Sequence, residues 1–163
     1  MTGQGLDELD GRIVALFSER PDIGVLGASR ALGVARGTVT ARLERLGERG
    51  VITSFAPTVD PAGLGYPVTA YCSLQIRQES QQAGVVEHLR GIPEVLQAVT
   101  VTGEFDLLVT AVARDNADLQ RVIDLVVEHP RVERASTQIL LATHITPRIL
   151  PLVRASAGLS GSG

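Results

Sequence analysis

The sequence predicts an α+β protein with an N-terminal helical domain and a C-terminal domain in which strands and helices alternate. Apolar residues recur at helical spacing through residues 6–50. Proline and glycine then crowd residues 57–67, which is typical of a linker. From Val68 onward, short apolar runs of strand type alternate with stretches of helical spacing. These observations predict two domains joined by a short connection.

The first fifty residues predict three helices. Five apolar residues of the first helix share one face: Leu6, Leu9, Ile13, Leu16 and Phe17. Asp7 or a neighbour can cap this helix, and Pro21 ends it. A second helix is expected over Val25–Leu32, then a turn at Gly33 and a third helix over Arg36–Arg49, which Gly50 ends as a left-handed cap. The extended stretch Val51–Val59 suits a small hairpin or a wing. Together these elements predict a winged helix-turn-helix.

The second half predicts four strands and two helices. The strands are expected over residues 68–76, 95–101, 105–113 and 132–141, and the helices around 85–92 and 116–128. The order βαββαβ is that of a ferredoxin-like domain, in which both helices cover one face of an antiparallel sheet. The predicted boundaries are 1–55 for the helix-turn-helix domain, 56–67 for a linker strand and loop, 68–152 for the ferredoxin-like domain, and 153–163 for a small, polar, disordered tail.

Composition excludes several classes of function. The chain carries a net charge of −3 and has no lysine, so it lacks a Schiff-base lysine and a phosphate loop ending in Gly-Lys. Any DNA-binding surface must therefore be local. No apolar run reaches the roughly 18 residues of a membrane helix, and no secretory signal is visible. The single cysteine, Cys72, fits a reducing cytoplasm.

No catalytic, cofactor or metal site is expected. The three histidines are far apart in sequence and lack the spacing of metal ligands, either to each other or to Cys72. No nucleophile elbow is present. Cys72, inside a predicted strand, is most simply a small core residue. We therefore expect a protein that is not an enzyme and needs no cofactor.

The predicted third helix sorts its charges. On a helical wheel, Val39, Leu43 and Leu46 form the buried stripe, and one shoulder of it carries Thr38, Arg42, Arg45 and Arg49. A solvated face would tend to interleave the two signs, whereas a basic strip suits a phosphate backbone. Small residues near the start of the helix permit close approach to base edges. By itself the wheel leaves DNA contact and a solvated helix both open.

The ordered set of motifs resembles the leucine-responsive regulator/AsnC (Lrp/AsnC) family of transcription regulators. The resemblance covers residues 6–152 and is carried by Leu6-Asp7, Asp10, Ile13, Gly33, Arg42, Leu46, Gly50-Val51-Ile52, Val59-Asp60-Pro61, Leu64-Gly65, Gly103, Phe105-Asp106 and Asp115. It implies that the third helix recognises double-stranded DNA through Arg36, Gly37, Thr38, Thr40, Ala41, Arg42, Arg45 and Arg49. The chain departs from the family at Ala35-Arg36, where a serine cap and a proline are usual, and at Glu44, where a basic residue is common.

The resemblance also implies a small effector, commonly an amino acid, bound between subunits of a dimer or octamer that pairs through the sheet domains. The residues expected around this effector are Gly103, Glu104, Asp106, Asp115, Arg134, Ser136 and Gln138. Simpler roles remain open for several of them. Gly103 can serve a turn that needs positive φ, Asp106 can accept hydrogen bonds from that turn, and Asp115 can cap the following helix.

Two other functions remain open from the sequence. The chain could be a ferredoxin-like metabolite-binding protein or small enzyme whose helical domain contacts only protein. It could also be an architectural DNA-packing protein that responds to no effector. The arginine strip and the wing favour a transcription regulator over a metabolite-binding protein or small enzyme. The net negative charge and Glu44 instead favour the metabolite-binding protein or small enzyme.

Overall fold

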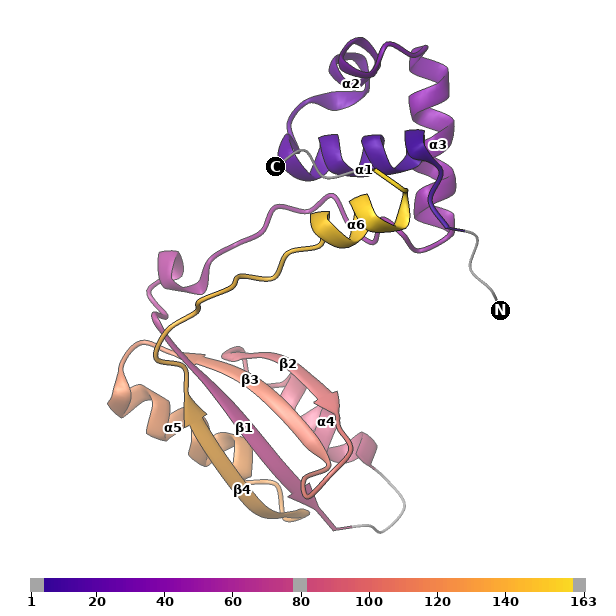
Figure 1. Cartoon of the computed structure of the whole chain (residues 1–163). Coiled ribbons are helices and arrows are strands. Elements are labelled where there is room, and N and C mark those ends of the chain that lie inside the picture. The colour runs from indigo at the N-terminus through magenta and orange to yellow at the C-terminus, as the bar shows by residue number, and fades with distance from the viewer. Residues whose placement is uncertain (1–4, 78–81, 160–163) are drawn as a thin grey trace. The chain divides into compact units, whose positions relative to one another are not determined.

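The computed structural model describes residues 5–77 and 82–159, which form two compact units. The first, called here the helical unit, contains the chain up to Pro57 together with the chain from Ile145 onward. The second, the sheet unit, is Thr58–His144. Figure 1 shows the chain leaving the helical unit once and returning to it at its C-terminal end.

The helical unit begins with the three predicted helices, α1 (Glu8–Glu19), α2 (Gly24–Leu32) and α3 (Arg36–Glu48). The Asp7 side chain caps α1 by accepting a hydrogen bond from the backbone N–H of Asp10 at 2.8 Å. Gly33 lies between α2 and α3 with φ 69°, and Gly50 follows α3 with φ 69°. Both glycines therefore supply the left-handed backbone that these two helix ends need.

The segment after α3 is the extended wing. The backbone N–H groups of Val51 and Ile52 both donate to the Leu46 carbonyl, at 2.9 and 3.2 Å, which turns the chain out of the helix. In the described chain, residues 53–60 form no strand, so of the two sequence-based alternatives the structure has a single extended wing. The Phe55 ring packs edge-on against Phe17 of α1, with centroids 6.0 Å apart.

The C-terminal segment corrects the predicted disordered tail. Residues Leu150–Ser156 form a helix, α6, that packs on α1. Val153 is buried with Ile13 and Leu46 in the core of the helical unit, and the Arg154 guanidinium lies 2.9 Å from the Glu19 carboxylate. A helix of this length is not stable by itself, so its local sequence gave no strong signal. Only residues 160–163 of the predicted tail lie outside the described residues.

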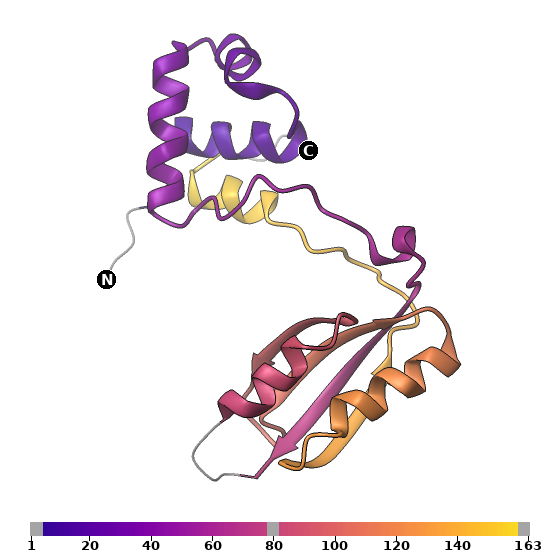
Figure 2. The same ribbon diagram turned by 180° about the vertical axis from the view of Figure 1, so that it is seen from behind.

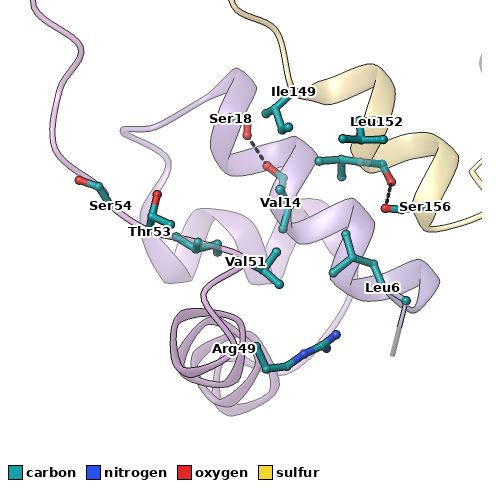
Figure 3. Close-up of a pocket in the computed structure, with 13 residues that line it drawn as sticks. Leu6, Val14, Ser18, Arg49, Val51, Thr53, Ser54, Ile149, Leu152 and Ser156 are labelled. Carbon is teal, nitrogen blue, oxygen red and sulfur yellow. Dashed lines mark hydrogen bonds between the residues drawn. The ribbon is translucent and has the colours of Figure 1, made fainter. Parts of the chain in front are cut away.

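A groove remains open between α1, α6 and the start of the wing. It has a volume of about 540 Å³ and is lined mainly by aliphatic side chains. In Figure 3, Val14 of α1 lies between Val51 on one side and Leu152 of α6 on the other, and Leu6, just before α1, lies beside them. α6 therefore covers only part of the apolar surface that α1 leaves beside α3.

The sheet unit has the predicted βαββαβ order. Its elements are β1 (Val68–Ile76), α4 (Gln82–Arg90), β2 (Val95–Thr100), β3 (Leu107–Ala113), α5 (Asn116–Val127) and β4 (Val132–Ile139), preceded by a 3-10 turn at Pro61–Leu64. The four strands lie in the order β2-β3-β1-β4, and every neighbouring pair is antiparallel. This is the ferredoxin-like topology expected from the sequence.

One face of this sheet is covered and the other is not. Along β1, Ala70, Cys72 and Leu74 are buried in the core formed with α4 and α5. Figure 2 shows both helices on the same side of the sheet. The alternate residues Tyr71 and Ser73 point to the opposite face. None of the described helices of this unit lies on that face. None of the helices in the described ranges is long and apolar enough to cross a membrane.

The packing of α6 on α1 depends on the absence of a side chain at Gly11, and this gives a test by substitution. A Cβ at Gly11 would lie 2.4 Å from the Ala157 Cβ. We expect Gly11→Ala to lower the melting temperature of the full chain, because α6 must move. In a chain ending at residue 148 the same change should raise it, since alanine favours a helix over glycine by about 1 kcal/mol. Calorimetric melting of both chain lengths checks this, and a change of the same sign in both would contradict the packing of α6.

Candidate nucleic-acid interface and ligand site

A buried carboxylate on α1 binds the arginines of α3. Asp10 is 1% exposed. The Arg42 Nη1 donates to its Oδ1 at 2.8 Å, and the Arg45 Nη2 donates to both oxygens at 3.0 and 2.8 Å. The Arg49 Nη1 lies 3.9 Å from Oδ2. Three and four residues separate these arginines along α3, so they lie on one side of the helix. That side faces α1.

Asp7 adds a second carboxylate to the same cluster. Its Oδ2 accepts a hydrogen bond from the Arg42 Nη1, and the Arg45 Nη2 lies 3.6 Å away. The hydrogen bond from Arg42 and the backbone N–H of Asp10 hold the pKa of Asp7 below its ordinary value, because both stabilise the ionised carboxylate. The same contacts with Asp7 and Asp10 raise the pKa of Arg42. We call Asp7 and Asp10 the carboxylate pair.

The carboxylate pair explains why the arginines of α3 lie on one side of the helix. The sequence suggested that Arg42, Arg45 and Arg49 form a strip available to phosphate. Arg42 is only 25% exposed at its side chain, and Arg45 is 48% exposed, with both guanidinium groups hydrogen-bonded to α1. Opposite charges on the neighbouring helix therefore account for the sorting. Contact between these arginines and DNA stays a prediction.

The outward face of α3 carries the other residues predicted to contact DNA. Arg36, Gly37, Thr38, Thr40 and Ala41 are all exposed. The first turn has no side-chain cap, since Ala35 stands at that position, and the backbone N–H of Thr38 donates to the Ala35 carbonyl at 3.0 Å. Glu44 and Glu48 are also exposed and make the second half of this face acidic.

Arg30 is a further candidate for DNA contact, which the sequence did not single out. It lies in the last turn of α2, is exposed, and precedes the Gly33 turn. Neither Arg30 nor Arg36 forms a hydrogen bond or an ion pair with any described residue. Its place in the sequence could have indicated this role, because Arg30 lies in the predicted helix before the turn. In helix-turn-helix proteins that helix crosses the DNA backbone.

Formal charge is divided unequally between the two units. The helical unit contains nine arginines and seven acidic residues, which leaves it at +2. The sheet unit contains six arginines and eleven acidic residues, which leaves it at −5. The net charge of −3 is therefore the sum of a positive helical unit and a negative sheet unit. A positive helical unit fits the local DNA-binding surface expected from the sequence.

The candidate ligand site lies at the hairpin between β2 and β3. Gly103 has φ 127°, as expected for its turn. The Asp106 Oδ2 accepts a hydrogen bond from the backbone N–H of Ile76 at 2.7 Å, and the Asp106 N–H donates to the Leu74 carbonyl at 2.9 Å. Asp106 thus fastens the hairpin to the end of β1, where the sequence suggested a bond within the turn.

The hairpin also reaches β4. The Arg134 Nη1 donates to the Glu104 Oε1 at 2.8 Å, and the Arg134 guanidinium lies 5.7 Å from the centre of the Phe105 ring. Ser136 and Gln138 follow Arg134 on the uncovered face of the sheet, opposite Ser73 and Tyr71 of β1. The structure therefore brings the hairpin residues and Arg134 together, with Ser136 and Gln138 further along the same strand.

Asp115 does not join this group within one chain. It follows the C-terminal end of β3, whereas the hairpin precedes its N-terminal end. Seven residues of strand span roughly 20 Å, so the two ends of β3 are well separated. The Asp115 carboxylate caps α5 by accepting a hydrogen bond from the Asp118 N–H at 2.8 Å. The simpler role that the sequence allowed for Asp115 is therefore the observed one.

Two histidines distant in sequence are neighbours in the sheet unit. The rings of His88 and His129 lie 5.5 Å apart, and the His88 Nε2 is hydrogen-bonded to the Leu125 carbonyl at 2.7 Å. Within the described ranges, no three His, Cys, Asp or Glu side chains group as metal ligands.

Cys72 is buried, and burial raises the pKa of its thiol, which makes it an inert core residue.

Comparison with known proteins gives two matching family models. Residues 6–53 match a winged helix-turn-helix DNA-binding domain, and residues 69–150 match the Lrp/AsnC ligand binding domain. The HTH-type transcriptional regulator FL11 of Pyrococcus horikoshii is 29% identical over 90% of this chain and 97% of its own length.

Solved structures share the fold. E. coli AsnC superposes with a TM-score of 0.80 at 24% identity, over 90% of this chain and 99% of its own. A transcriptional regulator of Neisseria meningitidis, solved as a complex with L-methionine, superposes with a TM-score of 0.77 at 22% identity, over 90% of this chain and 99% of its own. Both likenesses extend over the two units of the chain.

Proposed function

Because this chain belongs to the Lrp/AsnC family of DNA-binding transcription regulators, we propose that it recognises specific DNA sequences and that an amino acid bound to its sheet unit controls this recognition. Its relatives are regulators and not enzymes. The observation that carries the DNA side of the proposal is the pair of exposed arginines, Arg30 and Arg36, on either side of the Gly33 turn.

The second helix of a helix-turn-helix, here α3, enters the major groove with its N-terminal residues toward the bases. Gly37, Thr40 and Ala41 are short and exposed, which allows the backbone of α3 to approach base edges closely. Arg30 and Arg36 would bind phosphates on either side of the groove. Thr38 would contact either a base or a phosphate. The acidic residues Glu44 and Glu48 restrict this face to its first half.

An amino acid fits the charges around the hairpin. Asp106 uses one carboxylate oxygen for Ile76, and its other oxygen has no partner among the described residues, so it can accept from an ammonium group. Arg134, which forms an ion pair with Glu104, would supply a cation for the carboxylate group of the amino acid. The complex of a fold relative with L-methionine adds support for this class of ligand. A ligand that prefers one assembly shifts the population by its differential affinity.

The uncovered sheet face is the surface through which we propose that two copies pair. Tyr71 and Val99 are 36% and 38% exposed there, although both are large and apolar. Serine and threonine side chains lie among them, a mixture that suits a subunit interface. Pairing through this face would bring Ser136 and Gln138 of each copy toward the other, which is where an effector between subunits would bind.

The phosphate contacts can be tested by their salt dependence. Arg30→Gln and Arg36→Gln should each weaken binding to all DNA sequences. Each should also reduce the slope of log affinity against log salt by about 0.9, since one phosphate contact is lost. Arg12→Gln is the matched control, because Arg12 lies on the side of α1 away from Asp10. Fluorescence anisotropy at several salt concentrations measures the slopes. Slopes equal to that of Arg12→Gln would exclude these phosphate contacts.

The effector site can be tested with a nearly isosteric change. Asp106→Asn keeps an acceptor for the Ile76 N–H but removes the charge that would bind an ammonium group. We expect it to abolish amino-acid binding measured by calorimetry and the accompanying change in DNA affinity, which is roughly 5–150-fold for a typical allosteric coupling. DNA binding without ligand should stay near wild type. Asp124→Asn on α5 serves as a control. If the amino acid binds both variants equally well and changes their DNA affinity equally, the site lies elsewhere.

The oligomer can be tested on the isolated sheet unit. Residues 58–144 form a compact unit with their own core, so we expect this fragment to fold alone and to be at least dimeric by light scattering. Tyr71→Arg should produce monomers, because the charge would be buried at the interface. Gln120→Arg on exposed α5 is the control. A monomeric wild-type fragment would contradict pairing through the sheet.

A further inference from the structure

We propose that the carboxylate pair, Asp7 and Asp10, positions α3 for DNA recognition by holding Arg42 and Arg45. This inference rests on the proposed function, because it concerns how the DNA-reading helix is oriented. It assigns Arg42 and Arg45 a role inside the protein, whereas the sequence suggested contact with phosphate. Neither carboxylate would touch DNA.

The geometry fixes α3 in two directions. Arg42 and Arg45 bind the same Asp10 carboxylate, and three residues, almost one turn of helix, separate them. A rotation of α3 by one residue, about 100°, would carry both guanidinium groups away from Asp10. A shift of α3 along its axis would break the contact of Arg42 with Asp7 as well. These three contacts therefore define both the rotation of α3 and its position against α1.

The apolar contacts between α1 and α3 constrain this orientation less. Ile13, Val14 and Leu46 supply the buried core there, and all three are aliphatic. Hydrophobic burial is non-directional, so aliphatic side chains tolerate a small rotation, whereas hydrogen bonds between charged groups do not. α3 also lacks a side-chain cap at its start. The carboxylate pair is therefore the directional contact among those that hold α3.

Orientation matters more for reading bases than for binding phosphates. Hydrogen bonds to base edges require side chains and backbone at defined positions in the groove, while attraction of Arg30 and Arg36 to the phosphate backbone is long-ranged. Loss of the carboxylate pair should therefore lower specific affinity more than non-specific affinity. A contribution to folding alone would leave the ratio of the two unchanged in the molecules that fold.

Two substitutions remove one negative charge with little change in shape. In Asp10→Asn, the released guanidinium groups can reach water, because the Arg42 and Arg45 side chains are 25% and 48% exposed. In Asp7→Asn the α1 cap is retained, since asparagine caps helices as well as aspartate does. Glu8→Gln is the matched control, because it removes the same charge from an exposed position in α1 that forms no ion pair with the described residues.

The experiment measures the affinity of the full chain for a fragment from beside its own gene and for a scrambled fragment, over a series of salt concentrations. Thermal melting of each variant establishes that it is folded. We expect Asp10→Asn to reduce the specific-to-scrambled ratio by roughly 5- to 150-fold, the discrimination carried by one good base contact. Its salt slope should equal that of Glu8→Gln. Adding Arg45→Gln to Asp10→Asn should reduce the ratio no further, because both act through one contact.

Several results would overturn the proposal. One is an unchanged ratio in folded Asp10→Asn; another is a steeper slope with tighter binding to both fragments, which would mean that the pair merely withholds arginine charge from DNA. If Asp10→Asn does not fold, Asp7→Asn decides by the same measurement, and an unchanged ratio again overturns the proposal. A wild-type chain with no preference between the fragments would instead contradict the proposed function.

Discussion

The arrangement of the helical unit depends on the burial of one charge. Asp10 is 1% exposed, and a carboxylate in that position is costly unless cations and hydrogen bonds compensate it. Arg42 and Arg45 provide both, and they come from the helix that would read DNA. The surface of α3 is thereby divided. Its arginine side is hydrogen-bonded to α1, and its small residues are exposed.

The arginines of the helical unit differ in their surroundings. Three of the nine arginines of the helical unit lie within 4 Å of the carboxylate pair, which offsets part of their positive charge. Arg30 and Arg36 flank the turn between α2 and α3, while the exposed Glu44 and Glu48 add negative charge farther along α3. Arg30 and Arg36 pair with no described residue, and two such cations near acidic neighbours fit the proposal that the protein binds DNA as an oligomer.

Two chain segments connect the sheet unit to the helical unit. The chain leaves the helical unit after Pro57, and it returns after β4, where residues 140–149 lead into α6. The strand that carries Arg134, Ser136 and Gln138 is therefore continuous with a helix packed on α1. A rearrangement of β4 has a short covalent route to the unit that contacts DNA. The Asp106 bond to Ile76 similarly ties the proposed ligand hairpin to β1, which begins after the other connecting segment.

The sequence by itself determined the element order, because periodicity and helix-end residues are local signals. Gly50 and Gly103 adopt the positive φ expected of them, Gly33 lies in the expected turn, and Asp7 and Asp115 cap the helices that follow. Tertiary structure decided the partners. A helical wheel sorts Arg42 and Arg45 onto one shoulder but cannot show that Asp10, more than thirty residues earlier, lies opposite. Helix α6 escaped prediction for the same reason. Its seven residues are too few to form a stable helix alone, and contacts with α1 in the space above Gly11 and in the core around Val153 stabilise it.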